Sequence, residues 1–186
     1  MNKAIIELKD VYTSFDGNVV HSGINLSVQE GEIISLIGSS GVGKSLLLKE
    51  LIGILKPDSG EIVIMGRDIV PLKEEALIEI RRNIGILFQG AALFDSLSVY
   101  ENIAYPLREH TKLKEKEIQE KIEEKLALVG LEGAENKMPD ELSGGMKKRV
   151  GLARAIAIEP KIILYDEPTT GIDPVTAEKI NELILS

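Results

Sequence analysis

The sequence contains no cysteine and only two histidines, and these absences exclude several chemistries. Without cysteine there is no disulfide, no thiolate metal site and no cysteine nucleophile. His21 and His110 are far apart in the sequence, which argues against a histidine-based metal centre. The chain also lacks an apolar run of the length that a membrane-spanning helix requires. At its start, Glu7 and Asp10 interrupt the sequence before the apolar part of a secretory signal could form.

Positive charge is also scarce, because 30 Asp and Glu residues outnumber 22 Lys and Arg residues and give a formal net charge of −8. Nonspecific binding of nucleic acid depends on clustered Lys and Arg, so this balance argues against a nucleic-acid partner. The hydrophobic fraction of 44% over 186 residues is sufficient for the core of one ordinary domain.

Short apolar runs alternate with helical patterns along the chain. Strand patterns cover 4–8, 24–28, 33–37, 61–65, 84–88 and 161–165, and helical spacing covers 44–54, 112–125 and 146–157. The runs at 33–37, 84–88 and 161–165 are typical of buried strands. This alternation predicts an α/β protein with a parallel sheet and a helical insertion.

Residues 38–45 read GSSGVGKS and match the pattern G-x-x-x-x-G-K-[ST] between an expected strand and an expected helix. The glycines allow successive backbone N–H groups to face phosphate oxygens, and the following helix adds its positive end. Lys44 would bring a charge to the β- and γ-phosphates, and the Ser45 hydroxyl would be a ligand for Mg²⁺. A glycine-rich turn with an exposed lysine is the alternative, but the context favours nucleotide binding. The phosphate-binding residues are Gly38, Ser39, Ser40, Gly41, Val42, Gly43, Lys44 and Ser45.

The last buried-strand pattern ends in two acids, Asp166 and Glu167. In an open parallel sheet, ligands bind at the carboxyl ends of the strands, where a phosphate loop also lies. Asp166 is therefore a candidate Mg²⁺ ligand, and Glu167 is a candidate general base for a water that attacks the γ-phosphate. Taken alone, the pair would be an acidic cap on a strand. Two adjacent acids favour hydrolysis over transfer to a hydroxyl acceptor.

A second glycine element, Ser143, Gly144 and Gly145, stands at the start of an expected helix, with Ser143 suited to be its N-cap. The hydroxyl, the backbone N–H groups and the helix N-terminus together form a second phosphate-binding surface, although a flexible cap is the alternative. One chain would then carry two phosphate-binding elements for one nucleotide. Two copies arranged head to tail would explain this, because each would complete the other's site.

The order of these motifs resembles the ATP-binding subunits of ABC transporters. GSSGVGKS is similar to their Walker A motif, LSGGM with KKRVGLARAIA to their signature helix, and IILYDEP to their Walker B strand. The resemblance implies that Tyr12 stacks on adenine, that Gln89 completes the Mg²⁺ environment and faces a permease, and that Asp173 belongs to the D-loop. It also implies that ATP and Mg²⁺ bind in a dimer, and that Lys147, Lys148 and Arg149 lie on the polar face of the signature helix.

The segment 87–111, LFQGAALFDSLSVYENIAYPLREHT, resembles more narrowly the ATPases of Mla-type phospholipid transporters. This likeness implies two partners: a membrane permease that contacts the segment after Gln89, and Mce-domain lipid-binding components. It places the protein at the cytoplasmic face of a bacterial inner membrane. The run Ala91, Ala92, Leu93 and Phe94 is expected to form an apolar surface there, with buried core as the alternative. An ABC ATPase for another small solute such as an amino acid, and a nucleotide-binding fragment without turnover, stay open.

The resemblance implies a P-loop NTPase fold, with a RecA-like parallel sheet, an N-terminal antiparallel β subdomain and an α-helical insertion. One ABC ATPase domain would span 1–186, with 1–88 and 159–186 forming the catalytic core and β subdomain, and 89–158 forming the helical subdomain. Proteins of this kind continue into a further core strand and a histidine switch, which these residues do not include. We therefore expect an incomplete domain with a gap beside the phosphate-loop strand, and poor stability or activity of the 186-residue chain alone.

Overall fold

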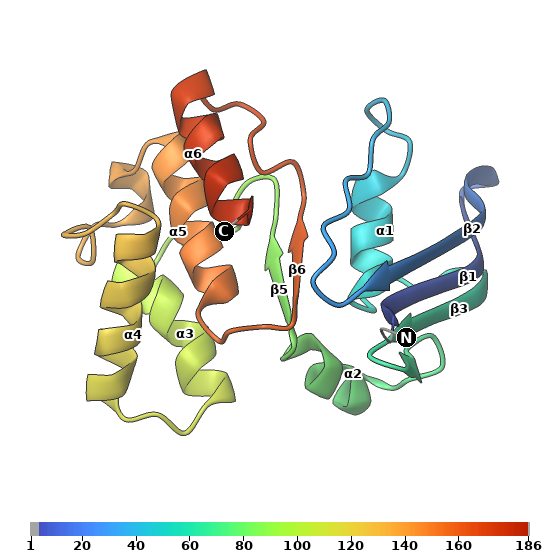
Figure 1. Ribbon diagram of the computed structural model, residues 1–186, viewed down its shortest axis with the longest axis horizontal. Coiled ribbons are helices and arrows are strands. Elements are labelled where there is room, and N and C mark those ends of the chain that lie inside the picture. The colour runs from blue at the N-terminus through green and yellow to red at the C-terminus, as the bar shows by residue number, and fades with distance from the viewer. Residues whose placement is uncertain (1–3, 186) are drawn as a thin grey trace. The chain divides into compact units, whose positions relative to one another are not determined.

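The computed structural model describes residues 4–185. The chain forms two compact units, one up to Arg81 and the other from Arg82 onward (Figure 1). Every helix among the described residues is too short or too polar to cross a membrane.

The first unit is built on a four-stranded antiparallel sheet in the order β2-β1-β3-β4. Its strands are β1 (Ala4–Phe15), β2 (Asn18–Gln29), β3 (Ser59–Ile64) and β4 (Arg67–Asp68). Asp16 and Gly17 join β1 to β2 with φ angles of 47° and 79°, as a tight hairpin turn requires. Leu8 lies opposite Ile62, and both side chains are buried. The sheet confirms the expected N-terminal antiparallel subdomain.

Two helices complete this unit. Helix α1 (Lys44–Leu51) follows the glycine-rich loop and buries Leu47, Leu48 and Leu51, as the helical spacing predicts. Helix α2 (Glu74–Arg81) has no counterpart in the sequence analysis. Its last residue, Arg81, donates from Nε to the carbonyl of Ile52 at 2.7 Å and so ties the end of α2 to the end of α1.

The strand expected at 33–37 is absent, and this prediction is wrong. The segment takes part in neither sheet, and Ile33 and Ile37 are 63% and 93% exposed. A continuous apolar run is typical of a parallel strand with neighbours on both sides. Among the described residues no strand pairs with this segment, so its apolar side chains stay accessible.

The second unit contains a short parallel pair, β5 (Ile84–Leu87) and β6 (Ile162–Tyr165), with Ile84 opposite Ile162 and Leu87 opposite Tyr165. Gly85 in β5 allows a helix to lie close, since a Cβ there would be 2.3 Å from the carbonyl oxygen of Ala155. The pairing confirms the two buried-strand patterns and the parallel direction.

The described part of this unit also contains four α-helices, of which α5 packs against β5: α3 (Val99–His110), α4 (Glu115–Leu128), α5 (Gly144–Ile156) and α6 (Pro174–Leu185), with a 3₁₀ turn at Pro139–Glu141. Helix α4 buries Ile118, Ile122 and Leu126 at four-residue intervals. Its core neighbours include Ile103, Leu107 and Val150 from α3 and α5. These helices confirm the expected α-helical insertion.

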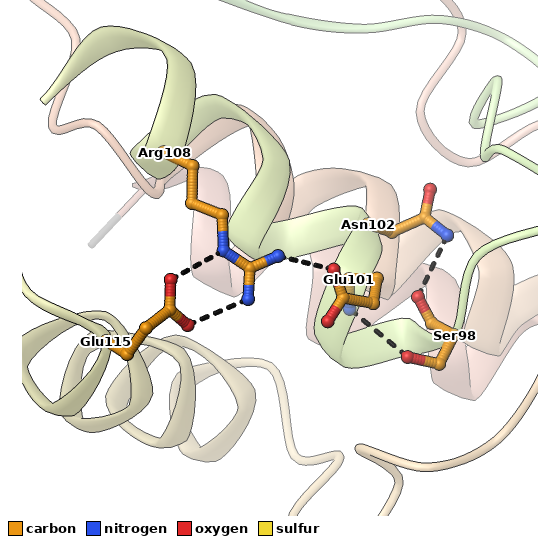
Figure 2. Close-up of polar contacts among 5 residues, drawn as sticks. All are labelled: Ser98, Glu101, Asn102, Arg108 and Glu115. Atoms are coloured by element: carbon orange, nitrogen blue, oxygen red, sulfur yellow. Dashed lines mark hydrogen bonds and ion pairs between the residues drawn. The ribbon is translucent and has the colours of Figure 1, made fainter.

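The loop that precedes α3 is fastened by the fully buried Asn102 (Figure 2). Its Nδ2 donates to the carbonyls of Phe94, Leu97 and Ser98 at 3.2, 2.9 and 3.0 Å, and its Oδ1 accepts from the Phe94 N–H at 2.9 Å. In Figure 2, Arg108 lies between two carboxylates and contacts both oxygens of Glu115 at 2.8 Å. This contact lowers the pKa of the exposed Glu115 carboxyl.

Replacing Asn102 by Ala should lower the free energy of unfolding by about 2–3 kcal/mol, because the part-buried Phe94 N–H and Leu97 carbonyl lose the side-chain amide that binds them. Arg108→Ala is the control, with an expected loss below about 1 kcal/mol, since exposed ion pairs contribute little. Urea denaturation measures both variants. Equal losses would contradict the special role of Asn102.

Candidate functional site

The phosphate loop wraps around the side chain of Lys44. Its Nζ donates to the carbonyls of Gly38 and Ser39, both at 2.9 Å. Gly41 and Gly43 have φ angles of 83° and 100°, which favour glycine. The carbonyl of Gly43 accepts the first helical hydrogen bond, from the N–H of Leu47, and α1 begins directly after it. The loop–helix order agrees with the sequence analysis, whereas the preceding strand is missing.

A buried polar cluster supports this loop from inside the first unit. His21 Nε2 lies 3.2 Å from the Gly43 carbonyl oxygen, and its Nδ1 lies 3.1 Å from Glu50 Oε2. The Thr13 hydroxyl donates to Glu50 Oε1 at 2.5 Å, and all three side chains are buried. A Cβ at Gly43 would be 2.5 Å from Val20 Cγ1 and 2.7 Å from His21 Nε2, so only glycine fits there. This cluster is not among the features predicted from the sequence.

Tyr12 of β1 belongs to the same unit and is 45% exposed. The ring lies against Gly23, where a Cβ would be 2.8 Å from the phenolic oxygen. An exposed aromatic ring resting on a neighbouring strand is available for stacking. The role of Tyr12 toward adenine stays a prediction.

The carboxyl ends of β5 and β6 bring together residues that are far apart in the sequence. The pairing continues past the strands, because the Asp166 N–H donates to the Leu87 carbonyl at 2.9 Å. Directly beyond, Gln89 Nε2 donates to Glu167 Oε2 at 2.8 Å. The structure therefore places Gln89, Asp166 and Glu167 at one edge of the parallel pair, as the topology predicts.

The turn that carries Glu167 is held by Lys148 of α5. Glu167 has a φ of 50°, which is unusual for a residue with a side chain. Lys148 is only 7% exposed, and its Nζ donates to the carbonyls of Glu167 at 3.0 Å and Thr170 at 2.6 Å. Burial lowers the pKa of the Lys148 ammonium, and the Glu167 carboxylate acts in the opposite direction.

The prediction that Lys147, Lys148 and Arg149 together lie on the polar face of the signature helix is therefore wrong. Lys148 points into the protein, and Arg149 Nη1 donates to the carbonyls of Val129 and Gly130, both at 3.0 Å. Lys147 is partly exposed. Cations in the second turn of α5 thus bind the carbonyls of neighbouring segments, which the run of three basic residues in the sequence does not reveal.

The start of α5 agrees with the predicted N-cap. The Ser143 hydroxyl accepts from the Met146 N–H at 3.3 Å, and α5 begins at Gly144. A Cβ on Gly144 would meet no atom within 4 Å. Gly145 is half-buried. Among the described residues, packing therefore does not require glycine at position 144.

The segment after Gln89 is fixed by Arg154 of α5. Ala91 and Ala92 have φ angles of 62° and 47°, and Arg154 donates to their carbonyls at 2.7 and 2.8 Å. Ala91 is 1% exposed, so it belongs to the core and not to the expected apolar surface. Ala92 is exposed, Leu93 is half-buried, and Phe94 is 45% exposed with its ring centroid 5.2 Å from that of Tyr105, so this part of the expected surface is accessible. Asp173 precedes α6 and accepts the Ala177 N–H at 2.9 Å.

Residues 21–170 match the family model described as ABC transporter. The chain belongs to the ABC transporter family. It is 50% identical over 180 residues to the probable ribonucleotide transport ATP-binding protein mkl of Mycobacterium tuberculosis, covering 97% of this chain and 50% of that protein. It is 46% identical over 184 residues to the intermembrane phospholipid transport system ATP-binding protein MlaF of Haemophilus influenzae, covering 99% and 70% respectively.

Solved ABC cassettes share the fold. The dimeric structure of the ATP-binding cassette MJ0796 bound to ADP and Pi matches with a TM-score of 0.90 and 35% identity, covering 96% of this chain and 81% of that one. The match confirms the expected P-loop NTPase fold. The ABC transporter chain described here spans about half the length of its mycobacterial relative.

In this ABC cassette, removing one partner of the buried His21–Glu50 pair behind the phosphate loop should lower the free energy of unfolding more than replacing both partners. Glu50→Leu removes the acceptor from Thr13 and the carboxyl group beside His21, and should lower the free energy of unfolding by about 3 kcal/mol. The double variant His21→Leu/Glu50→Leu should recover at least about half of that loss, because no polar side chain of the pair is left unpartnered. Denaturant unfolding of both variants measures the difference, and additive losses would contradict the pairing.

Proposed function

We propose that this protein is the ATP-hydrolysing subunit of an ABC transporter. The observation that carries the proposal is the contact between Gln89 Nε2 and Glu167 Oε2 at the edge where β5 and β6 end. A glutamine and a glutamate in contact beside Asp166, in a chain that also has a phosphate loop, suit the hydrolysis of a nucleoside triphosphate.

The phosphate loop binds the nucleotide in this proposal. Backbone N–H groups of residues 38–45 and the N-terminus of α1 face the phosphates, and the Lys44 ammonium neutralises their charge. Lys44 already lies within the loop, bound to the carbonyls of Gly38 and Ser39. The exposed ring of Tyr12 stacks on the adenine.

The residues also suit a bound Mg²⁺. The described part of the chain contains no group of three His, Cys, Asp or Glu side chains placed to hold a metal, and in this proposal phosphate oxygens contribute ligands. Ser45 supplies a hydroxyl and Asp166 a carboxylate. Gln89 donates through Nε2 to Glu167, which leaves its amide oxygen as the metal-facing atom. When bound, the ion would neutralise charge on the β- and γ-phosphates.

Glu167 acts as the general base. Its carboxylate accepts the proton of a water that attacks the γ-phosphate, while Gln89 holds one carboxylate oxygen at 2.8 Å and fixes its direction. The site is completed by the second subunit of a head-to-tail homodimer, whose Ser143, Gly144 and Gly145 contact the γ-phosphate. The open space at Gly144 and the dimeric state named for the MJ0796 cassette support this arrangement. Asp173, which precedes α6, belongs to the same dimer contact.

Glu167→Gln should keep ATP binding and lower kcat by about 100-fold or more, since general-base catalysis contributes on this scale. Lys44→Ala should weaken nucleotide binding itself, because it removes a cation from the phosphates. Nucleotide affinity and single-turnover hydrolysis, measured on the same preparations, separate these effects. Wild-type turnover by Glu167→Gln would reject the base assignment.

The transported substrate is a lipid in our proposal, moved across the bacterial envelope by a permease at the cytoplasmic face of the inner membrane. The support is the segment 87–111 and the phospholipid transport system named for the Haemophilus relative. The mycobacterial relative carries a ribonucleotide transport name, and an amino acid or another small solute is the further alternative. Mce-domain proteins would supply lipid binding outside the membrane.

In this proposal the permease contacts the exposed ring pair formed by Phe94, in the segment after Gln89, and Tyr105 of α3. Phe94→Glu should therefore abolish co-purification with the permease while ATP turnover of the isolated subunit stays within about twofold, because the ring lies outside the nucleotide machinery. The matched control is Glu120→Lys, which changes a charge on an exposed turn of α4 outside the segment 87–111 and should leave co-purification intact. Extraction of the purified complex distinguishes substrates: bound phospholipid and an Mce-domain component support lipid transport, and their absence would reject it.

A further inference from the structure

Lys148 is a buried lysine in the second turn of α5, four residues after Gly144. An ammonium inside a protein is costly unless hydrogen bonds replace its water. Its Nζ donates to two main-chain oxygens, those of Glu167 and Thr170. A lysine that contributes only to solubility or surface charge would be exposed to solvent.

Both acceptors belong to the turn that carries Glu167. The left-handed backbone of Glu167 costs a residue with a side chain about 1 kcal/mol. Its carbonyl also accepts from the Thr170 N–H at 3.3 Å. Lys148 therefore binds the first and the last carbonyl of this turn and opposes its relaxation to an ordinary backbone conformation.

The direction of the Glu167 side chain follows from this backbone, because a change of φ would swing the carboxylate away from Gln89. We propose that Lys148 is a positioning residue, which holds the backbone of Glu167 so that the carboxylate of the same subunit stays beside Gln89. This inference rests on the proposed function, in which Glu167 deprotonates the attacking water. Lys148 itself contacts neither the nucleotide nor the water.

A substitution of Lys148 can also lower turnover in a second way, through the partner's site, and the experiment must distinguish this effect from the positioning of Glu167. Lys148 lies on the helix that begins with Ser143 and Gly144, which serve the partner's nucleotide in the proposed dimer. A substitution that displaced α5 would then impair the partner's site. Positioning of Glu167 acts within one subunit, so the two routes predict losses at opposite sites of the dimer.

The first measurement compares single variants of the assembled ATPase. Lys148→Met keeps the aliphatic stem and removes the donors, so kcat should fall about 10- to 100-fold, as for a misplaced catalytic group, with the KM for ATP within about twofold. Lys148→Arg keeps donors and charge and should restore most of kcat. Lys147→Met is the matched control and should behave as wild type. If thermal unfolding shows that Lys148→Met is not folded, Lys148→Leu, which also lacks donors, takes its place.

The second measurement uses mixed dimers with differently tagged subunits, one of which carries Glu167→Gln so that a single site turns over. Lys148→Met in the subunit with intact Glu167 should lower turnover by the factor seen in the homodimer. Lys148→Met in the Glu167→Gln subunit should leave turnover unchanged. Losses in the opposite subunit, or equal losses in both, would overturn the proposal, as would wild-type kcat in the Lys148→Met homodimer. Wild-type turnover by the Glu167→Gln homodimer would instead reject the base assignment itself.

Discussion

The parallel pairing of β5 with β6 is the constraint on which the proposed catalytic edge depends. Because the strands run in the same direction and in register, the residues that follow them emerge together. Gln89 and Glu167 meet there although 78 positions separate them. An antiparallel pair would place them at opposite ends. Gly85 keeps this arrangement compact, since it lets α5 approach β5 so closely that no larger residue fits.

Helix α5 connects this edge to the surrounding loops through three buried or half-buried cations. Lys148 binds the turn of Glu167, Arg149 binds the end of α4, and Arg154 binds the segment after Gln89. Each donates to main-chain carbonyls, so each acts on backbone conformation. Burial lowers the pKa of Lys148 and of Arg154, which shows that both cations are held against a desolvation cost.

What the sequence predicts well is local or topological. The Ser143 cap needs only its own helix, and the meeting of Gln89 with Glu167 needs only parallel strands. The burial of a segment is harder to predict, because it depends on the elements that pack against it. The run 33–37 has the pattern of a core strand, yet no described strand pairs with it. The sequence wrongly predicts an exposed Lys148, because a lysine between two basic residues is typical of a solvated helix face. Glu50 gave a usable signal, since it stands three residues after Leu47 on the apolar side of α1.

Residues with a left-handed backbone conformation occur where side chains of α5 bind main-chain carbonyls. Glu167, Ala91 and Ala92 all have positive φ angles, and the carbonyl of each accepts from Lys148 or Arg154. Such conformations persist only where surrounding contacts determine them. A displacement of α5 therefore acts at once on the turn of the proposed base and on the segment beside Phe94. The backbone conformation of both loops therefore depends on one helix.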